Sequence, residues 1–229
     1  MRSTESLDNV VFRSLTGGTH SRLAQRRGRA VRYPVDVSGF AALPDQPQRR
    51  DWNDLAALAG TSGPVALTNH GAEPPESWTA LSRFTVVQMI DDEVDARPDP
   101  DMLYLSGEDV PEMLQLVAQT KPGPFAPRTI DMGSYIGLRR AGRLVAMAGE
   151  RFRPPGWTEI SAVCTAPEFR GRGLATRLVQ ALAYGIRERG ETPFLHVASS
   201  NTKAVALYEA LGFTPRRTFE AVVVRPPNP

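Results

Sequence analysis

A glycine-rich turn with two arginines is the segment of this chain best suited to hold a ligand. It spans residues 170–175, after an apolar run at 160–165 and before an amphipathic stretch that ends near Arg189. Backbone N–H groups at the start of a helix lack intrahelical partners and lie at the positive end of the helix dipole. Glycines also let a phosphate approach the backbone closely. The sequence therefore predicts a pyrophosphate site at this turn.

Two widespread phosphate-binding motifs do not match the turn. The dinucleotide fingerprint Gly-x-Gly-x-x-Gly needs a third glycine where this chain has Thr176. The P-loop needs Gly-Lys-Ser/Thr, which does not occur at the turn. What remains is the pattern Arg-x-x-Gly-x-Ala, formed by Arg170, Gly173 and Ala175.

A second motif follows at residues 201–213, where an asparagine precedes the pair Leu-Tyr and then the run Leu-Gly-Phe. In order and separation, the two motifs resemble the acyl-CoA signature of the GNAT superfamily of N-acetyltransferases. The stretches 159–165 and 195–197 are similar to the FR47-like group of that superfamily. The resemblance covers roughly residues 101–224.

The resemblance implies a GNAT fold of the α/β (α+β) class. Its mixed, mostly antiparallel sheet contains two parallel strands that splay apart, here residues 159–165 and 194–198, and helices flank the sheet. Acetyl-CoA would lie in the gap as co-substrate, with its pantetheine paired to the first strand. The residues implied in cofactor binding are Val163, Cys164, Thr165, Arg170, Gly171, Arg172, Gly173, Leu174, Ala175, Thr176 and Asn201.

The same resemblance implies direct acetyl transfer, in which an amine attacks the thioester. Tyr208 matches the position of the general acid that protonates the CoA thiolate. A phenol with an ordinary pKa of about 10 is protonated at neutral pH and can do so. The alternative is that Tyr208 only packs against Ala204 and Leu211, one helical turn away on either side.

A base or a water chain must remove the proton of the amine. His196 occupies the place where ribosomal-protein alanine acetyltransferases carry a catalytic glutamate, and Glu159 begins the first splayed strand, where other members place a carboxylate base. The alternatives are a histidine hydrogen-bonded within the sheet and a solvated carboxylate at a strand end. The choice between His196, Glu159 and water stays open.

Cys164, the single cysteine, would lie near the thioester. We expect a structural role for its thiol, because transfer in this superfamily is direct and lone cysteines in apolar strands are usually structural. One cysteine permits no intrachain disulfide, which fits a reducing compartment.

Apolar periodicity indicates the elements that position these residues. The stretch after Gly173 predicts a helix with an apolar face, and the flanking stretches 157–165 and 194–198 predict strands. Further strands are expected at 64–68, 84–90, 102–105, 135–138, 144–151 and 219–224, and further helices at 51–58, 108–117 and 201–211.

The chain divides into two parts in this interpretation. Residues 99–229 would form the GNAT domain, and residues 1–98 an N-terminal region that in some relatives is a degenerate acyltransferase-like half. Residues 91–100 are acidic and contain prolines, which indicates a linker. Residues 1–50 are polar and indicate irregular structure.

Composition argues against membrane or nucleic-acid partners. The net charge is only +2, so no strong field attracts a polyanion. No apolar run approaches the ~18 residues of a membrane span, and residues 1–10 lack the apolar core of a signal peptide. We expect a cytoplasmic protein.

Basic and histidine residues of the N-terminal region suggest no further site. His20 and His70 show no metal-ligand spacing. The basic cluster lacks the interleaved aromatics that stack on bases, so it predicts a solvated face or an acidic-substrate contact. Its members are Arg22, Arg26, Arg27, Arg29 and Arg32.

The implied acceptor is a primary amine of a small molecule or peptide. Its walls would come from residues 107–128 and the N-terminal region. A non-catalytic acyl-CoA sensor with the same fold is the alternative, and a homodimer stays open.

Overall fold

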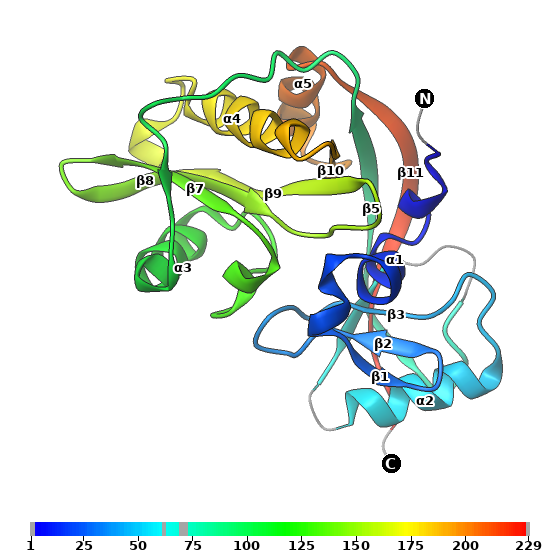
Figure 1. Cartoon of the computed structure of the whole chain (residues 1–229). Coiled ribbons are helices and arrows are strands. Elements are labelled where there is room, and N and C mark those ends of the chain that lie inside the picture. The colour runs from blue at the N-terminus through cyan, green and yellow to red at the C-terminus, as the bar shows by residue number, and fades with distance from the viewer. Residues whose placement is uncertain (1–2, 61–62, 69–72, 228–229) are drawn as a thin grey trace.

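Apolar runs in the second half of the chain form most of an eight-stranded sheet in the computed structural model, which describes residues 3–60, 63–68 and 73–227 (Figure 1). The strand order is β4-β11-β5-β10-β9-β8-β7-β6. The strands are β4 Val65–Leu67, β5 Thr79–Asp91, β6 Leu103–Tyr104, β7 Tyr135–Arg140, β8 Arg143–Glu150, β9 Trp157–Thr165, β10 Thr192–Ala198 and β11 Phe213–Arg225.

Helices cover both faces of this sheet. Helix α4 (Leu174–Glu188) and helix α5 (Thr202–Ala210) lie on one face, and α3 (Val110–Thr120) lies on the other (Figure 1). The predicted apolar face of α4 is confirmed, because its leucines and isoleucine are buried against β8, β9 and β10. These buried residues are Leu174, Leu178, Leu182 and Ile186. This core fixes the start of α4 against the ends of β9 and β10.

The two central parallel strands separate along their length. β9 and β10 pair from Trp157 opposite Thr192 to Ile160 opposite Leu195, and their pairing stops there within the described residues. Past that point β9 carries an irregularity against β8, and Ala162 has a positive φ of 53°. A bulge of this kind bends a strand away from its neighbour. The predicted splayed strands are therefore confirmed.

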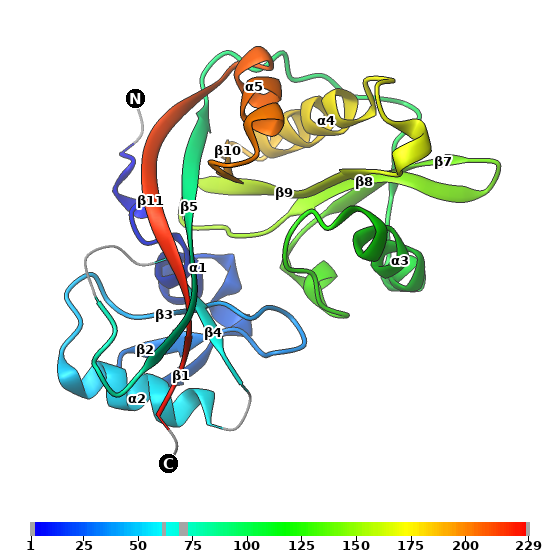
Figure 2. The same ribbon diagram turned by 180° about the vertical axis from the view of Figure 1, so that it is seen from behind.

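Two strands of the N-terminal region, β4 and β5, belong to this sheet. β5 lies between β10 and β11 and pairs antiparallel with both. The two long strands β5 and β11 run side by side from the upper part of the molecule into its lower part (Figure 2). The sheet therefore crosses the boundary predicted at residue 98, and the division into two parts stays a prediction.

The expectation that residues 1–50 are irregular is wrong. They form a three-stranded sheet with α1 and part of α2, and a core of buried residues such as Leu15 and Tyr33 lies between them. Strands of two or three residues are too short to show alternation, which is why the sequence missed them. The elements are α1 Val10–Gly17, β1 Gln25–Arg27, β2 Ala30–Arg32, β3 Ala41–Ala42 and α2 Arg49–Ala59.

The expected linker at 91–100 forms no helix or strand after Asp91, but it is bound to the domain. Val94 is buried in the core beneath α4. Asp91 and Asp99 form ion pairs with Arg187 and Arg177 of that helix. The segment is therefore a fixed part of the packing rather than a free connection.

The basic cluster does not form a solvated face as a whole. Arg32 is only 2% exposed and donates to the carbonyls of Tyr33 and Ala59. Arg29 pairs with Asp51 of α2. These arginines stabilise the N-terminal sheet, so that part of the prediction is wrong.

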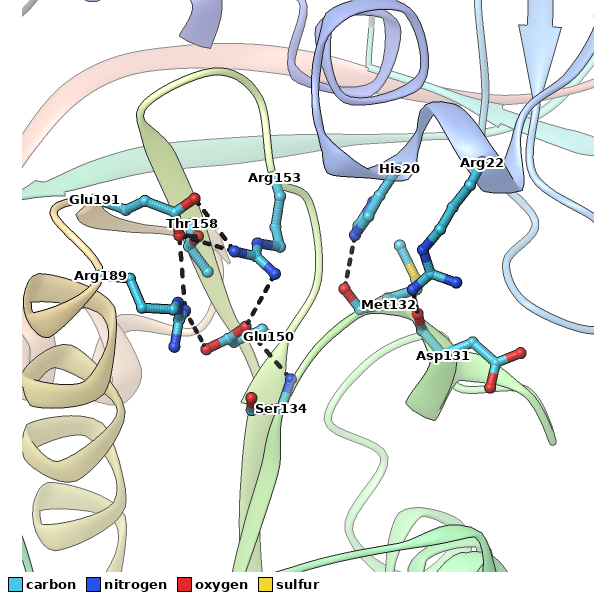
Figure 3. Close-up of polar contacts among 10 residues, drawn as sticks. All are labelled: His20, Arg22, Asp131, Met132, Ser134, Glu150, Arg153, Thr158, Arg189 and Glu191. Carbon is cyan, nitrogen blue, oxygen red and sulfur yellow. Dashed lines mark hydrogen bonds and ion pairs between the residues drawn. The ribbon is translucent and has the colours of Figure 1, made fainter.

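Polar contacts join the N-terminal region to the segment that precedes β7 (Figure 3). His20 is buried, with one ring nitrogen 2.8 Å from the Tyr33 hydroxyl and the other 2.6 Å from the carbonyl of Met132. Arg153 lies between Glu150 and Glu191. The other histidine of this region, His70, lies outside the described residues. Among the helices that are described, none combines the length and apolar character needed to cross a bilayer.

Candidate active site

A cavity of about 710 Å³ lies where β9 and β10 separate. It extends from the glycine-rich turn before α4, past α5, to β5 and β11. Twelve of the fourteen predicted site residues line it, while Glu159 and Arg172 do not. The lining members are Val163, Cys164, Thr165, Arg170, Gly171, Gly173, Leu174, Ala175, Thr176, His196, Asn201 and Tyr208.

The glycine-rich turn is open on the side where a ligand would approach. Gly171 and Gly173 have φ values of 74° and 70°, a conformation that side chains other than glycine rarely adopt. A Cβ atom at either position would have no atom within 4 Å. Conformation, not crowding, therefore requires glycine here. The first turn of α4 begins with N–H groups that have no intrahelical partner.

Two arginines of the turn are held by backbone carbonyls. The Arg170 Nε donates to the carbonyl of Thr165 at 3.3 Å, and Arg172 donates to the carbonyl of Glu168 at 3.1 Å. The Arg172 guanidinium also lies 5.0 Å from the centre of the Phe169 ring. Arg170 lines the cavity and Arg172 stands outside it.

Helix α5 presents the asparagine and the tyrosine of the second motif. The Asn201 side chain accepts a hydrogen bond from the N–H of Ala204 at 3.2 Å and thereby caps the helix. Tyr208 packs edge-to-face on Phe213 and belongs to the core beneath α4 and α5. Burial raises the pKa of Tyr208 to about 12. Its phenol is therefore protonated at neutral pH.

Glu159 is fully buried rather than a solvated strand end. Arg151 binds it with two hydrogen bonds of 2.9 and 2.5 Å, and the N–H of Phe152 adds a third at 3.3 Å. Burial alone would raise the pKa of Glu159, but the charge of Arg151 and the hydrogen bonds from Arg151 and His196 outweigh it and lower the pKa to about 2. A carboxylate of this kind is a weak base.

His196 has a hydrogen-bond partner on each ring nitrogen. Nδ1 lies 2.8 Å from Glu159 Oε1, and Nε2 lies 3.0 Å from the Gln88 amide nitrogen. That amide is itself oriented, because its oxygen accepts from Arg216 and its nitrogen donates to the Leu7 carbonyl. These partners assign a neutral ring that carries its proton on Nδ1. The structure therefore matches the hydrogen-bonded histidine named as the alternative.

No local pattern in the sequence indicates that Gln88, Arg151 or Arg216 belongs to this network. Arg151 is only the last residue of the strand predicted at 144–151. Gln88 and His196 are 108 residues apart, and only the pairing of β5 with β10 brings them together. Strand pairing over that separation cannot be deduced from one sequence.

The Cys164 thiol is poorly suited to nucleophilic attack. The residue is buried beneath α3, and burial raises the pKa of its thiol to about 11. The thiolate is the reactive form, and it is nearly absent at neutral pH with such a pKa. This supports the expected structural role.

The segments expected to form acceptor walls also contribute residues to the cavity lining. Phe40 and Thr68 come from the N-terminal region, and Lys121 and Pro124 come from the loop after α3.

Comparison with known proteins agrees with this fold. The family model of FR47-like proteins matches residues 135–222. A solved structure of a GNAT-family acetyltransferase from Novosphingobium aromaticivorans is 39% identical, with a TM-score of 0.87 over 96% of this chain and 98% of that one. The chain therefore belongs to the GNAT family of acetyltransferases.

Two curated relatives match shorter regions. N-alpha-acetyltransferase RimI of Mycobacterium tuberculosis is 34% identical over 43% of this chain, and the match covers 66% of that protein. Mycothiol acetyltransferase of Thermobispora bispora is 39% identical over 37% of this chain, and the match covers 31% of that protein. The matches thus cover from about a third to two thirds of these relatives.

Proposed function

We propose that this protein is an acetyl-CoA-dependent N-acetyltransferase that transfers an acetyl group directly to a primary amine of a small molecule or peptide. The observation that carries the proposal is one continuous cavity that joins the glycine-rich turn, the splayed strands and Tyr208. The relatives support acetyl transfer, since one is named an N-alpha-acetyltransferase and another a mycothiol acetyltransferase.

The residues present fit acetyl-CoA as co-substrate. The turn offers open backbone N–H groups and Arg170 to a pyrophosphate. Thr165 on β9 has a buried hydroxyl without a hydrogen-bond partner among the described residues, which is a group that a ligand would satisfy. The bend of β9 away from β10 exposes strand edges to which an extended pantetheine can pair. Bound there, acetyl-CoA supplies the thioester.

In this proposal Tyr208 donates a proton to the departing sulfur. Its phenol lines the cavity and stays protonated at neutral pH. Proton donation from a positioned side chain requires this form of the group.

For the amine proton, the hydrogen bonds favour water over both predicted bases. Both oxygens of Glu159 are bound, and the only lone pair of His196 faces an N–H of Gln88. We assign Glu159 and His196 as positioning residues that hold the cavity wall. Their predicted role as bases stays a hypothesis.

A thiol-release assay tests the proposed function. The purified chain is incubated with acetyl-CoA and a panel of amines, and free CoA is measured. Amine-dependent release is expected. Calorimetric binding of CoA with no release on any amine would support the alternative, a sensor without turnover.

A further inference from the structure

The acceptor end of the cavity presents an apolar face of the sheet. Val86 of β5 lies opposite Phe219 of β11, and Phe84 lies opposite Ala221. Phe40 from the N-terminal region completes this surface, which we call the apolar wall. Phe84 is 43% exposed in the part of the chain that the structure describes, a high exposure for a phenylalanine.

The charged side chains of the described residues that line the cavity are all cationic. Among the described residues that line the cavity, none is Asp or Glu, whereas Lys121, Arg151 and Arg170 are present. Glu159 lies behind the lining, with both oxygens bound by Arg151 and His196 or by backbone. A second ammonium group on the acceptor would therefore meet cations and no counter-charge.

Two polar groups at the same end lack partners within the described part of the chain. The Thr68 hydroxyl is buried, with the residue 8% exposed, and has no hydrogen bond. Arg151 binds Glu159 through Nε and Nη2, which leaves Nη1 without a hydrogen bond. Both residues line the cavity. A hydroxyl and a guanidinium N–H are suited to hold one oxygen of a ligand, such as a carbonyl or carboxylate.

We infer that the acceptor is a monoamine with an aromatic or bulky aliphatic body that lies on the apolar wall, and not a polyamine or other polycation. An oxygen acceptor on the same molecule would be held by Thr68 and Arg151. This inference rests on the proposed transferase function and specifies its substrate class. It also agrees with a cavity lining that contains no described carboxylate, the group that a second ammonium would need as counter-charge.

The test compares kcat/KM for 2-phenylethylamine, phenylalanine amide and spermidine in the thiol-release assay. We expect both aromatic amines to exceed spermidine by at least roughly tenfold. A preference for spermidine would overturn the inference and leave the transferase function intact. If no amine causes release of CoA from acetyl-CoA, the transferase function is overturned, and this inference with it.

Substitutions at Phe84 test whether the apolar wall sets the preference for aromatic amines. Phe84→Ala should raise the KM for 2-phenylethylamine roughly tenfold without changing the KM for acetyl-CoA. Leu81→Ala is the matched control, because Leu81 lies on the same strand with 42% exposure and does not line the cavity. Phe84→Glu should shift the preference toward spermidine. Equal effects of the two alanine variants, or no shift with Phe84→Glu, would contradict the inference.

The proposed contact between Thr68 and an oxygen of the acceptor is tested separately. Thr68→Val keeps the shape of the side chain and removes the hydroxyl. It should lower kcat/KM for phenylalanine amide more than for 2-phenylethylamine, which has no carbonyl. Equal loss on both amines would contradict a Thr68 contact with the acceptor.

Discussion

His196 Nδ1 lies 2.8 Å from Glu159 Oε1, and this contact joins the two residues that were candidates for the base. Glu159 is also bound by Arg151, and His196 Nε2 receives an N–H from Gln88. Each of the two residues therefore satisfies hydrogen-bonding capacity of the other. Neither offers a free lone pair to an incoming amine. The two side chains act as one hydrogen-bonded unit, with His196 in the cavity wall and Glu159 behind it.

This relationship predicts how substitutions at position 196 behave. Glutamine can donate to Glu159 and accept from Gln88, so His196→Gln should keep kcat/KM within about tenfold. Its pH profile should keep the acid limb, because that limb reports the protonation of the amine itself. His196→Ala loses both hydrogen bonds and should lower stability and activity together.

A base role for His196 makes the opposite prediction. Loss of a general base usually costs about 100-fold or more in rate. If kcat/KM of His196→Gln falls by that factor and no longer decreases toward acid pH, His196 is the base. The measurement is kcat/KM against pH for both variants and the unchanged chain.

The sequence predicted well what depends on local pattern. The bounds of β9 match the predicted strand, and the predicted apolar face of α4 is the buried one. It also predicted the turn, the helix after Asn201 and the position of Tyr208, because each lies in a short motif. It missed the insertion of β5 between β10 and β11, and with it the contact of Gln88 with His196. Those contacts depend on long-range strand pairing, which leaves no local signal.

Tyr208→Phe should separate proton donation from packing. The phenyl ring keeps the edge-to-face contact with Phe213 but has no proton to donate. We expect kcat to fall about 100-fold while the KM for acetyl-CoA stays nearly unchanged. Because the pKa of Tyr208 is about 12, the unchanged enzyme should show no alkaline loss of kcat from this residue up to about pH 11. Equal kcat in the two proteins would reject the acid role.

Gly173→Glu should abolish CoA binding at the turn. The carboxylate would stand where a pyrophosphate is expected, and like charges repel. Gly173→Ala is the matched control, since a Cβ meets no atom there and only the positive φ is strained, at about 1–2 kcal/mol. Calorimetry with CoA should show a loss above roughly 100-fold for glutamate and about tenfold at most for alanine. Similar affinities for the two variants would place the pyrophosphate elsewhere.

His20 should make the fold sensitive to mild acid. Burial lowers the pKa of His20 to about 4 from an ordinary 6.5, although its hydrogen bond to Met132 opposes the shift. Below pH 6.5 the unfolded chain binds a proton that the folded chain does not bind until pH falls to about 4. Stability contributed by the neutral ring is therefore present above pH 6.5 and is lost as pH falls toward 4. Between pH 7 and 5 the free energy of unfolding should decrease by about 2 kcal/mol from this residue. His20→Gln removes the titrating group and keeps an amide that can donate to Met132, so urea unfolding should show a smaller loss over the same interval. An equal loss in the variant would assign the acid sensitivity to other groups.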